Sequence, residues 1–529
     1  MSTDVDVIVI GSGAGGMAAA VAMARAGRRV LVLEQHTLPG GWCHSFDLEG
    51  YSFSPGVHYL GELGPNGKLR EVYEGLGVMK ELAFEELDPD GYDQIHIGSA
   101  PVFKVPKGRE AYKARLAERF PHDADGLREV IDILAGVARE LKVFDEPYKG
   151  LRGLFREAPH VMRHALRPLS KLVEPRVKDP LARAVLYAIG GDHGMPPRRC
   201  ATILHAGVVG HYLGGAWYPK GGARALPKAF IHELRRHGGQ IKVGARVEQL
   251  LVEGGRAIGV RLADGTEIRA ADVVSNADPH ATAALLPDGA LPWRWRLRLP
   301  RLAYSSSSMS LFMAAEIDPA AHDLTSGNVW LLRGPDVATV QDYAQAADPQ
   351  GPVPALFLTC TTLKDPTKRR PEGIHTFEAF SFVSWDAFAP WADTPEGDRP
   401  AAYEARKESI AEGMLDLIET RIPGFRDRLV FRSTGSPLTN RHYVAGTRGA
   451  MYGTEKAWYN MGPLGFGPKT PIPGLWMCGA SAMSHGVAGA TLSGVEAASA
   501  VLHVRKRELL KAEAPEAPRP LPRPEAQRA

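Results

Sequence analysis

The sequence lacks the features of a disulfide-bonded, secreted or membrane-spanning protein. It contains no run of about 18 apolar residues, the length that spans a bilayer as a helix. Its first apolar segment begins at Val5, so we expect no cleavable leader. The four cysteines lie too far apart for a redox-active pair or a disulfide framework: Cys43, Cys200, Cys360 and Cys478. We therefore expect a cytoplasmic protein, either free or peripheral on a membrane.

The sequence also lacks an excess of charge of either sign. Its 63 basic and 60 acidic residues leave a net charge of +3, which is too balanced for a general nucleic-acid binder. Any charged partner must therefore bind to a local patch of charged residues. The length of 529 residues exceeds the roughly 250 to 300 residues at which a single hydrophobic core stops growing, so we expect at least two domains.

What the sequence does contain is a glycine-rich turn between two buried strands near its start. An apolar strand from Val5 to Ile10 leads into GSGAGG at residues 11–16, and an alanine-rich helix follows. A second apolar strand, residues 30–33, ends at Glu34. This strand, turn, helix and strand with a terminal acid form the pattern that binds an adenine dinucleotide. Phosphate would rest against the helix N-terminus, and the Glu34 carboxylate would accept hydrogen bonds from the adenosine ribose.

Two later blocks of the chain have the character of the same dinucleotide-binding domain. Residues 216–290 contain a helix and several short strands, and residues 430–504 contain a strand, a glycine turn and a small-residue helix. With residues 1–90, these blocks predict one cofactor domain that the chain leaves and rejoins twice. Residues 91–215 and 291–429 would form a separate α+β substrate domain. Residues 505–529, rich in Pro, Ala, Glu and Arg, predict a disordered tail.

Several short motifs carry a resemblance to a known family. They are the GSGAGG turn, Glu34, Pro39-Gly40-Gly41, the SPGVHYLG segment at residues 54–61, Pro219-Lys220-Gly221-Gly222 and Gly479-Ala480-Ser481. Together they resemble the FAD-dependent phytoene desaturases, carotenoid isomerases and all-trans-retinol saturases, and PGVHYLGE looks most like the retinol saturase branch. The resemblance extends to about Leu502. It implies an α/β fold with a glutathione-reductase-like, Rossmann-type FAD domain assembled from discontinuous segments, and FAD bound non-covalently.

The resemblance assigns the FAD-contacting residues position by position. The glycine turn would cradle the pyrophosphate, Gly40 and Gly41 would let a loop pass beside the flavin, and the Val247 backbone would meet the adenine. Residues 479–480 would contact the ribityl chain and pyrophosphate, while a helix near Ala488 would direct N–H groups at flavin N1 and O2. The full set is Gly11, Gly13, Ala14, Gly15, Gly16, Glu34, Gly40, Gly41, Val247, Gly479, Ala480, Val487, Ala488, Gly489 and Ala490.

Three separated cofactor blocks favour FAD over a nicotinamide nucleotide. A dehydrogenase that binds only NAD needs no further cofactor segments hundreds of residues downstream, whereas FAD must be wrapped along its whole length. No second GxGxxG follows a strand, so we expect no dedicated nicotinamide domain. Electrons must come from an external donor or go to an external acceptor, unless the reaction is a redox-neutral isomerisation.

Four residues are candidates for chemistry beside the flavin. The resemblance places His58 and Tyr59 beneath the flavin and His485 near the ring edge, where each could shape the pocket or pass a proton. Glu62 could donate a proton to a double bond if it were buried beside an apolar substrate, because desolvation raises the pKa of a carboxyl group. The plainer interpretations are hydrogen-bonded loop histidines and an exposed glutamate.

No metal site is expected. His232 and His237 superficially resemble the histidines of a zinc-protease helix. They stand five positions apart, however, and residues must be three or four apart to share a helix face. The pair therefore predicts no metal ligation.

Two stretches could bind a membrane surface. Between residues 149 and 178, basic residues outnumber acidic ones and alternate with apolar residues, as in a basic helix that lies in a bilayer interface. Residues 293–298, WRWRLR, add aromatic side chains of the kind found at such interfaces. The alternative is the solvated face of an ordinary helical lid.

We expect an FAD-dependent oxidoreductase that acts on a carbon–carbon double bond of an isoprenoid polyene, by desaturation, saturation or cis–trans isomerisation. Its partner would be a lipophilic small molecule and no nucleic acid, and the oligomeric state stays open. One alternative is a flavin amine oxidase, which shares the cofactor architecture but would need an aromatic cage. The other alternative is a non-catalytic flavin-binding protein.

Overall fold

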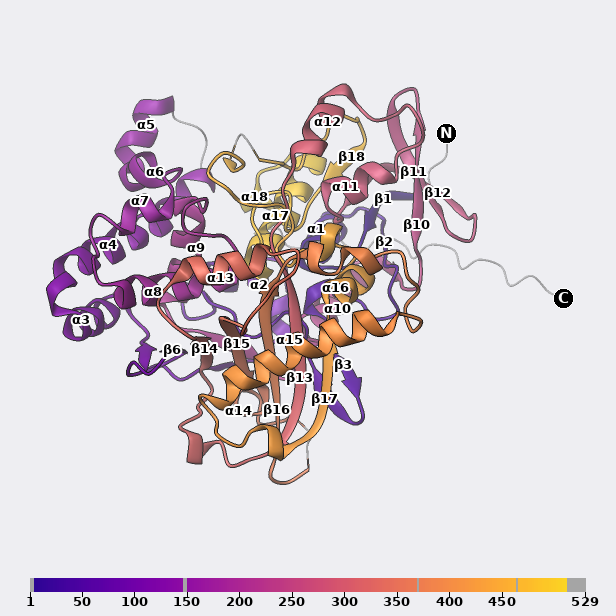
Figure 1. Ribbon diagram of the computed structural model, residues 1–529. Coiled ribbons are helices and arrows are strands. Elements are labelled where there is room, and N and C mark those ends of the chain that lie inside the picture. Colours follow the sequence, from indigo (N-terminus) through magenta and orange to yellow (C-terminus); the bar gives the residue numbers. More distant parts are fainter. Residues whose placement is uncertain (1–3, 146–149, 369–370, 463–464, 511–529) are drawn as a thin grey trace.

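The first sheet joins a parallel core to an antiparallel meander. The computed structural model describes residues 4–145, 150–368, 371–462 and 465–510 (Figure 1). The strands of the first sheet are β1 (Val5–Ile10), β2 (Val30–Leu33), β9 (Gln240–Lys242), β10 (Val247–Glu253), β11 (Arg256–Leu262), β12 (Glu267–Ser275) and β18 (Leu475–Met477). The parallel order is β18, β12, β1, β2 and β9. The three strands β10, β11 and β12 form the meander.

The two faces of β1 are covered by different elements, as its alternating side chains require. Val7 and Val9 pack against helices, whereas Ile8 and Ile10 pack against the meander. The helices on the first face are α1 (Ala14–Arg25), α10 (Ala225–Arg236) and α17 (Gly486–Leu502). Residues 15–24 of α1 are all buried, because α1 lies between the sheet and α17.

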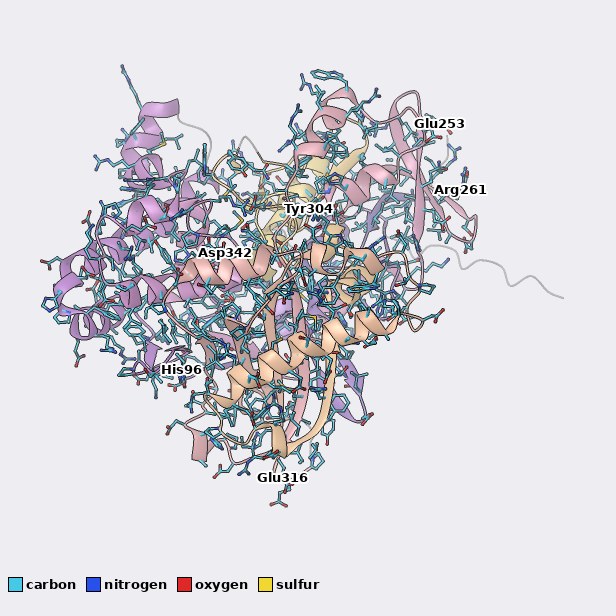
Figure 2. All side chains as sticks on the ribbon, viewed as in Figure 1. His96, Glu253, Arg261, Tyr304, Glu316 and Asp342 are labelled. Carbon is cyan, nitrogen blue, oxygen red and sulfur yellow. The ribbon has the colours of Figure 1, made fainter. Side chains whose placement is uncertain are left out.

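The meander carries charge pairs on its outer face. Arg261 lies 2.7 Å from Glu267, and Arg269 lies 2.9 Å from Glu253. Figure 2 shows Glu253 and Arg261 at the edge of the molecule. Strand β12 is one continuous strand of nine residues. Its first half pairs with β11 and its second half with β1 and β18, so one strand serves both the meander and the parallel core.

A second sheet of seven strands has the order β17, β13, β16, β15, β14, β6 and β7. Its strands are β6 (Asp93–Ile97), β7 (Phe103–Val105), β13 (Ser307–Glu316), β14 (Asn328–Leu332), β15 (Ala355–Cys360), β16 (Ile374–Val383) and β17 (Leu429–Gly435). Helix α15 (Ala401–Glu419) lies across one face (Figure 1) and packs on Met309, Leu311 and Met313 of β13. The boundary expected at residue 430 falls inside β17, which hydrogen-bonds to β13.

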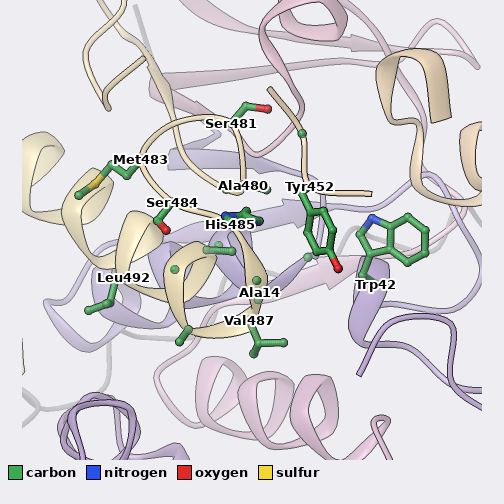
Figure 3. Close-up of a pocket in the computed structure, with 18 of the residues that line it drawn as sticks. Ala14, Trp42, Tyr452, Ala480, Ser481, Met483, Ser484, His485, Val487 and Leu492 are labelled. Carbon is green, nitrogen blue, oxygen red and sulfur yellow. The ribbon is translucent and has the colours of Figure 1, made fainter. Parts of the chain in front are cut away.

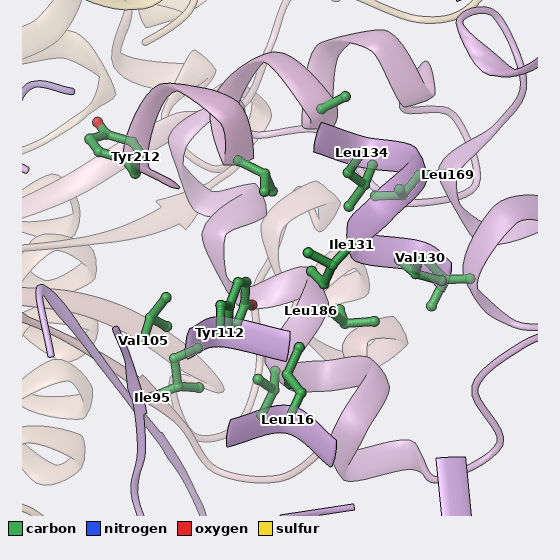
Figure 4. Packing of buried hydrophobic residues seen from close by; sticks show 14 of the residues in the cluster. Ile95, Val105, Tyr112, Leu116, Val130, Ile131, Leu134, Leu169, Leu186 and Tyr212 are labelled. Atoms are coloured by element: carbon green, nitrogen blue, oxygen red, sulfur yellow. The ribbon is translucent and has the colours of Figure 1, made fainter. Parts of the chain in front are cut away.

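A helical layer covers the other side of this sheet, at the left of Figure 1. Its helices are α3 (Arg109–Arg119), α4 (Ala124–Glu140), α5 (Gly150–Glu157), α6 (Pro159–His164), α7 (Leu169–Val173), α8 (Pro180–Ala188) and α9 (Thr202–Leu213). Figure 4 shows their shared core, with Leu116, Ile131 and Leu186 packed beside Ile95 of β6. The basic stretch from 149 to 178 is three short helices among its described residues, because Pro159 and Pro168 each interrupt the helical hydrogen bonding.

The remaining elements connect these layers. They are the hairpin of β3 (Phe46–Leu48) and β4 (Tyr51–Phe53), the pair of β5 (Phe84–Glu86) and β8 (Trp217–Pro219), and the helices α2 (Lys68–Gly75), α11 (Pro279–Ala284), α12 (Trp293–Arg298), α13 (Val337–Gln345), α14 (Thr361–Lys364), α16 (Pro437–Val444) and α18 (Lys506–Leu509). None of the helices in the described ranges is long and apolar enough to cross a membrane. The four cysteines are buried free thiols.

The first residues of the expected disordered tail are folded. Leu509 of α18 is buried against the cluster that contains α1 and α17, and its packing explains why order continues past residue 505. Residues 511–529, the rest of the expected tail, lie outside the described residues.

Candidate cofactor and active site

One cavity opens at the carboxyl ends of the parallel strands. Gly11 follows β1, Glu34 follows β2, Asn276 follows β12, and Gly479 comes two residues after β18; all four line this cavity of about 1850 Å³. Val247 at the start of β10 lines it as well. The crevice outside the carboxyl ends of the strands is where open α/β sheets bind ligands. The three sequence blocks predicted to hold a cofactor therefore meet in one groove.

Glycines allow these blocks to touch. A Cβ at Gly15 would lie 2.8 Å from the Gly479 backbone, and a Cβ at Gly13 would lie 2.9 Å from Asn276 Nδ2. A Cβ at Gly16 would lie only 2.1 Å from the Gly11 carbonyl oxygen. The turn can therefore fold tightly onto the strand and leave its backbone open to the cavity.

Two helix N-termini face the cavity without side-chain caps. The N-cap of α1 is Gly13 and that of α17 is His485, and neither offers a side-chain hydrogen bond to its helix. Ala14 and Val487 in the first turns both line the cavity (Figure 3). Uncapped N–H groups and the helix dipole favour anions. The site therefore has one place for a diphosphate and another for a ring system that gains negative charge.

Glu34 is held rigidly at the far side of the turn. One carboxylate oxygen accepts hydrogen bonds from the Ser12 N–H at 2.9 Å and the Ser12 hydroxyl at 2.6 Å, and the other accepts from the His36 N–H at 2.9 Å. Each oxygen has a further lone-pair direction, and the residue lines the cavity. This geometry leaves room for ribose hydroxyls as additional donors.

Thirteen of the fifteen residues expected to bind the cofactor line the cavity; Gly16 and Gly40 do not. Gly16 provides the close helix–strand contact described above. The Gly40 N–H donates to Ser12 Oγ at 2.9 Å, and its Cβ position is crowded by Pro227. Both glycines therefore shape the crevice through the residues that they pack against, without lining it themselves.

His58 and Tyr59 point into a buried polar network. His58 Nδ1 lies 3.1 Å from Glu378 Oε2, and its carbonyl oxygen accepts a hydrogen bond from Lys364 Nζ at 2.7 Å. The Tyr59 hydroxyl donates to Asp192 Oδ2 at 2.6 Å. Burial raises the pKa of Tyr59 well above its usual value, so its hydroxyl stays protonated. Both residues line the cavity.

Glu62 and His485 differ from what a proton donor needs. The Glu62 side chain is 38% exposed and lies 3.2 Å from His211 Nδ1, so it is not buried against an apolar substrate. His485 is buried, and this burial lowers its pKa to about 3. Its imidazole is therefore neutral at neutral pH. It can shape the part of the cavity where the edge of the flavin ring is expected. It is not an imidazolium cation that could donate a proton.

The cavity residues that the sequence interpretation missed include Trp42, Asp192 and Tyr452. Figure 3 shows the Tyr452 ring between His485 and Trp42. The rings of Tyr452 and His485 meet edge to face with centroids 4.9 Å apart. Trp42 directly follows the predicted Gly40-Gly41 pair, a signal that could have indicated it. No motif in the surrounding sequence indicated Asp192 or Tyr452.

Comparison with known proteins identifies the family. Residues 14–502 match the family described as flavin containing amine oxidoreductase. The chain belongs to this family. It is 30% identical to an all-trans-retinol 13,14-reductase of Danio rerio, over 94% of this chain and 86% of that protein, and 28% identical to a chloroplastic prolycopene isomerase of Daucus carota, over 94% and 80%. A solved oxidoreductase from Methanosarcina mazei, 18% identical, superposes with a TM-score of 0.64 over 94% of this chain and all of that one.

As a member of this family, the protein is an FAD-dependent enzyme. The predicted FAD cofactor, the α/β fold and the resemblance to the retinol saturase and carotenoid isomerase group are confirmed. The crevice fits FAD: the α1 turn would hold the diphosphate, Glu34 the ribose, and the α17 N-terminus the pyrimidine side of the ring. Bound FAD supplies hydride transfer. No cluster of metal-ligating side chains occurs in the described ranges, and His237 Nε2 lies 3.0 Å from Glu233 instead.

Proposed function

We propose that this FAD-dependent oxidoreductase acts on a carbon–carbon double bond of an isoprenoid polyene. The observation that supports this most directly is the wall of the cavity between α4 and α9. Most of its residues are small or aliphatic: Ala135, Ala138, Leu141, Ile203, Leu204, Gly207 and Val208. Arg139, Lys142 and His211 are charged or polar members of the same wall. Typical ligand pockets measure about 300–1,000 Å³, so a cavity of about 1850 Å³ accommodates a large cofactor and a long apolar molecule together.

The relatives support the same substrate class. One is named for the reduction of all-trans-retinol and the other for the isomerisation of prolycopene, and both compounds are conjugated polyenes. Such substrates offer few polar groups to bind. A water-poor cavity that lays the double bond against the flavin is therefore the main requirement. Tyr59 and His58 would hold the wall beneath the ring, and His485 would close its edge.

A blocked cavity tests this proposal. A Cβ at Gly207 would meet only Leu141, at 3.9 Å, so Gly207→Phe would fill the cavity without a backbone clash. We expect the purified wild type to bind FAD and, with reduced FAD under anaerobic conditions, to convert all-trans-retinol or prolycopene, as followed by chromatography. Gly207→Phe should keep the flavin spectrum and lose conversion. Gly334→Phe is the control, because its Cβ position is open and lies outside the cavity.

The amine oxidase alternative has one observation in its favour. Tyr452 and Trp42 both line the cavity and lie near one another in Figure 3, an arrangement that could enclose an amine. An amine oxidase would release hydrogen peroxide with polyamines and leave polyenes unchanged. That outcome in the same assay would replace the polyene proposal.

We further propose that the cavity loads its substrate from a membrane surface. Phe144 and Met483 line the cavity and are also exposed, by 58% and 40%. Exposed apolar residues also occur on two separate helices: Phe155 of α5, and Trp293 and Leu297 of α12. Both helices lie at the top of the view in Figure 1. On each helix arginines adjoin these residues in sequence, Arg156 on α5 and Arg294 and Arg296 on α12, a combination that suits an anionic bilayer interface.

A further inference from the structure

Asp192 presents a carboxyl group to the cavity in a fixed orientation. It ends a short 3-10 helix, Ile189–Asp192, after α8, and it lines the cavity. The Tyr59 hydroxyl donates to its Oδ2 at 2.6 Å. Tyr59 is itself stacked on Tyr212, with ring centroids 4.2 Å apart and an interplanar angle of 11°. The donor that holds this carboxyl is therefore immobilised by packing.

The same segment touches the part of the site expected to hold the flavin ring. The Tyr452 hydroxyl donates to the carbonyl oxygen of Gly191 at 2.8 Å. The Tyr452 ring lies against His485, the N-cap of α17, whose first turn lines the cavity. Tyr452 thus ties the Asp192 segment to the α17 N-terminus. Both elements line the same cavity.

We propose that Asp192 is the catalytic acid and base that exchanges a proton with a polyene carbon; this rests on the proposed function. In the reducing direction, bound reduced FAD would supply a hydride to one carbon of the double bond. Asp192 would give its proton to the π electron pair at the neighbouring carbon, so that two C–H bonds form while FAD is oxidised. The Asp192 carboxylate would regain a proton from water after the product leaves. Desaturation is the same sequence reversed.

The surroundings of Asp192 suit both directions. Burial raises the pKa of Asp192 to about 7, although hydrogen bonds from Tyr59 and Tyr212 and the charge of Lys364 oppose the rise. Efficient acid–base groups have a pKa near the working pH. The titratable groups that face it are Tyr59, Tyr92, Asp93, Tyr212, Lys364, Tyr452 and His485.

A second buried carboxyl group, that of Asp93, lies near the same Tyr59 hydroxyl as Asp192. Asp93 Oδ2 lies 3.3 Å from the Tyr59 hydroxyl, and Asp93 Oδ1 accepts from Asn328 Nδ2 at 3.0 Å. Burial and the neighbouring Asp192 raise the pKa of Asp93 well above its usual value. Two buried carboxyl groups on one hydroxyl cannot readily both ionise. Asp93 is therefore the carboxyl group of the pair that stays protonated, and Asp192 is the one that exchanges its proton near neutral pH.

The other titratable cavity residues are less suitable. His485 is neutral, and Glu62 is exposed and paired with His211, as described above. Lys456 is buried, and its Nζ donates to the Ser481 carbonyl oxygen at 3.1 Å and to Thr454 Oγ1 at 3.3 Å. The Lys456 amine is thus engaged by protein oxygens, whereas Asp192 lines the cavity and is held there by the hydroxyl groups of Tyr59 and Tyr212.

The kinetic experiment uses the FAD-loaded protein. FAD is reduced with dithionite, and single-turnover conversion of all-trans-retinol is followed in D₂O. The wild type should place two deuterium atoms across the newly saturated bond, one from the Asp192 carboxyl group and one from the reduced flavin, because both of these hydrogens exchange with the solvent. Asp192→Asn should convert the substrate at least about 100-fold more slowly than the wild type, with an unchanged flavin spectrum. Asp192→Glu should recover part of the rate. Asp123→Asn is the matched control, because Asp123 is a buried carboxylate outside the cavity that accepts hydrogen bonds from the Lys178 and Asp179 N–H groups.

A second readout does not depend on turnover. Among the infrared carbonyl bands of protonated carboxyl groups in the resting protein, one should disappear on titration with a midpoint near pH 7. This component should be absent from Asp192→Asn and present in Asp123→Asn. A wild type that converts no polyene rejects the proposed function itself. If the wild type converts the polyene and Asp192→Asn converts it equally fast, the role of Asp192 alone is rejected. The same holds if the conversion rate depends on pH in the wild type and in Asp192→Asn but not in Lys456→Met.

Discussion

Gly494 of α17 lies directly against the backbone of Gly15 of α1. A Cβ at residue 494 would lie 2.0 Å from the Gly15 carbonyl oxygen and 2.9 Å from the Ala19 nitrogen. Two helices from opposite ends of the chain therefore cross with their backbones in contact. This contact holds their uncapped N-termini against the same cavity, so the geometry of the FAD crevice depends on it.

Gly494→Ala should separate the two helices. The added methyl group meets backbone, which cannot rotate away, so we expect a loss of about 1–3 kcal/mol or more in the free energy of unfolding. FAD should also bind more weakly, because both helix ends move. Thermal unfolding and FAD release would measure this. Gly334→Ala, in open space, should leave both unchanged; a fully stable Gly494→Ala protein that retains FAD would contradict the contact.

Glu34→Ala should weaken FAD binding. The substitution removes the acceptor for Ser12 and His36 and for the ribose, and each buried donor left unpaired costs about 1–3 kcal/mol. We expect FAD affinity to fall about 10- to 100-fold, measured by quenching of FAD fluorescence. Glu253→Ala, on the exposed face of the meander, serves as control. Equal affinities in the two variants would rule out the assigned role of Glu34.

Lys456 should make stability depend on pH. Burial lowers its pKa from 10.5 to about 7, so between these values the unfolded chain binds a proton that the folded chain does not. Stability from this residue therefore rises as the pH increases from about 7 toward 10.5 and is lost as the pH falls. Lys456→Met should flatten the slope by up to about 1.4 kcal/mol per pH unit.

The measurement is urea unfolding at several pH values across this window. Lys364, whose pKa burial also lowers to about 7, contributes in the same direction, so the difference between variant and wild type is the informative quantity. Lys80→Met, at an exposed position, should reproduce the wild-type slope. A parallel slope for Lys456→Met would show that Lys456 stays charged in the folded protein.

The apolar patch on α12 should bind lipid. Trp293→Ser with Leu297→Ser removes two side chains that are 66% and 56% exposed. We expect sedimentation with vesicles of phosphatidylcholine and phosphatidylserine to fall several-fold, because apolar burial and charge act together at the interface. Val430→Ser, at a 49% exposed position on β17, is the control. Equal sedimentation of all three proteins would remove the membrane proposal.

The cofactor half of the site could be predicted because its signals are local. The order of strand, glycine turn, helix, strand and Glu34 lies within consecutive residues, where backbone conformation and hydrophobic period are determined by near neighbours. The same applies to the helix after His485. The break of the basic stretch at Pro159 and Pro168 was also readable from the sequence and was overlooked.

The reactive half could not be predicted in this way. Asp192 gains its character from burial and from Tyr59, Tyr212 and Lys364, which the fold brings together from distant parts of the chain. A carboxyl pKa depends on burial and on charges a few ångströms away, and neither can be read from the adjacent residues of the sequence. The amino-acid order alone therefore determined that an FAD crevice forms and which glycines open it. Only the packed tertiary structure decided which carboxyl group is buried at the cavity wall, because desolvation is a property of the assembled cavity.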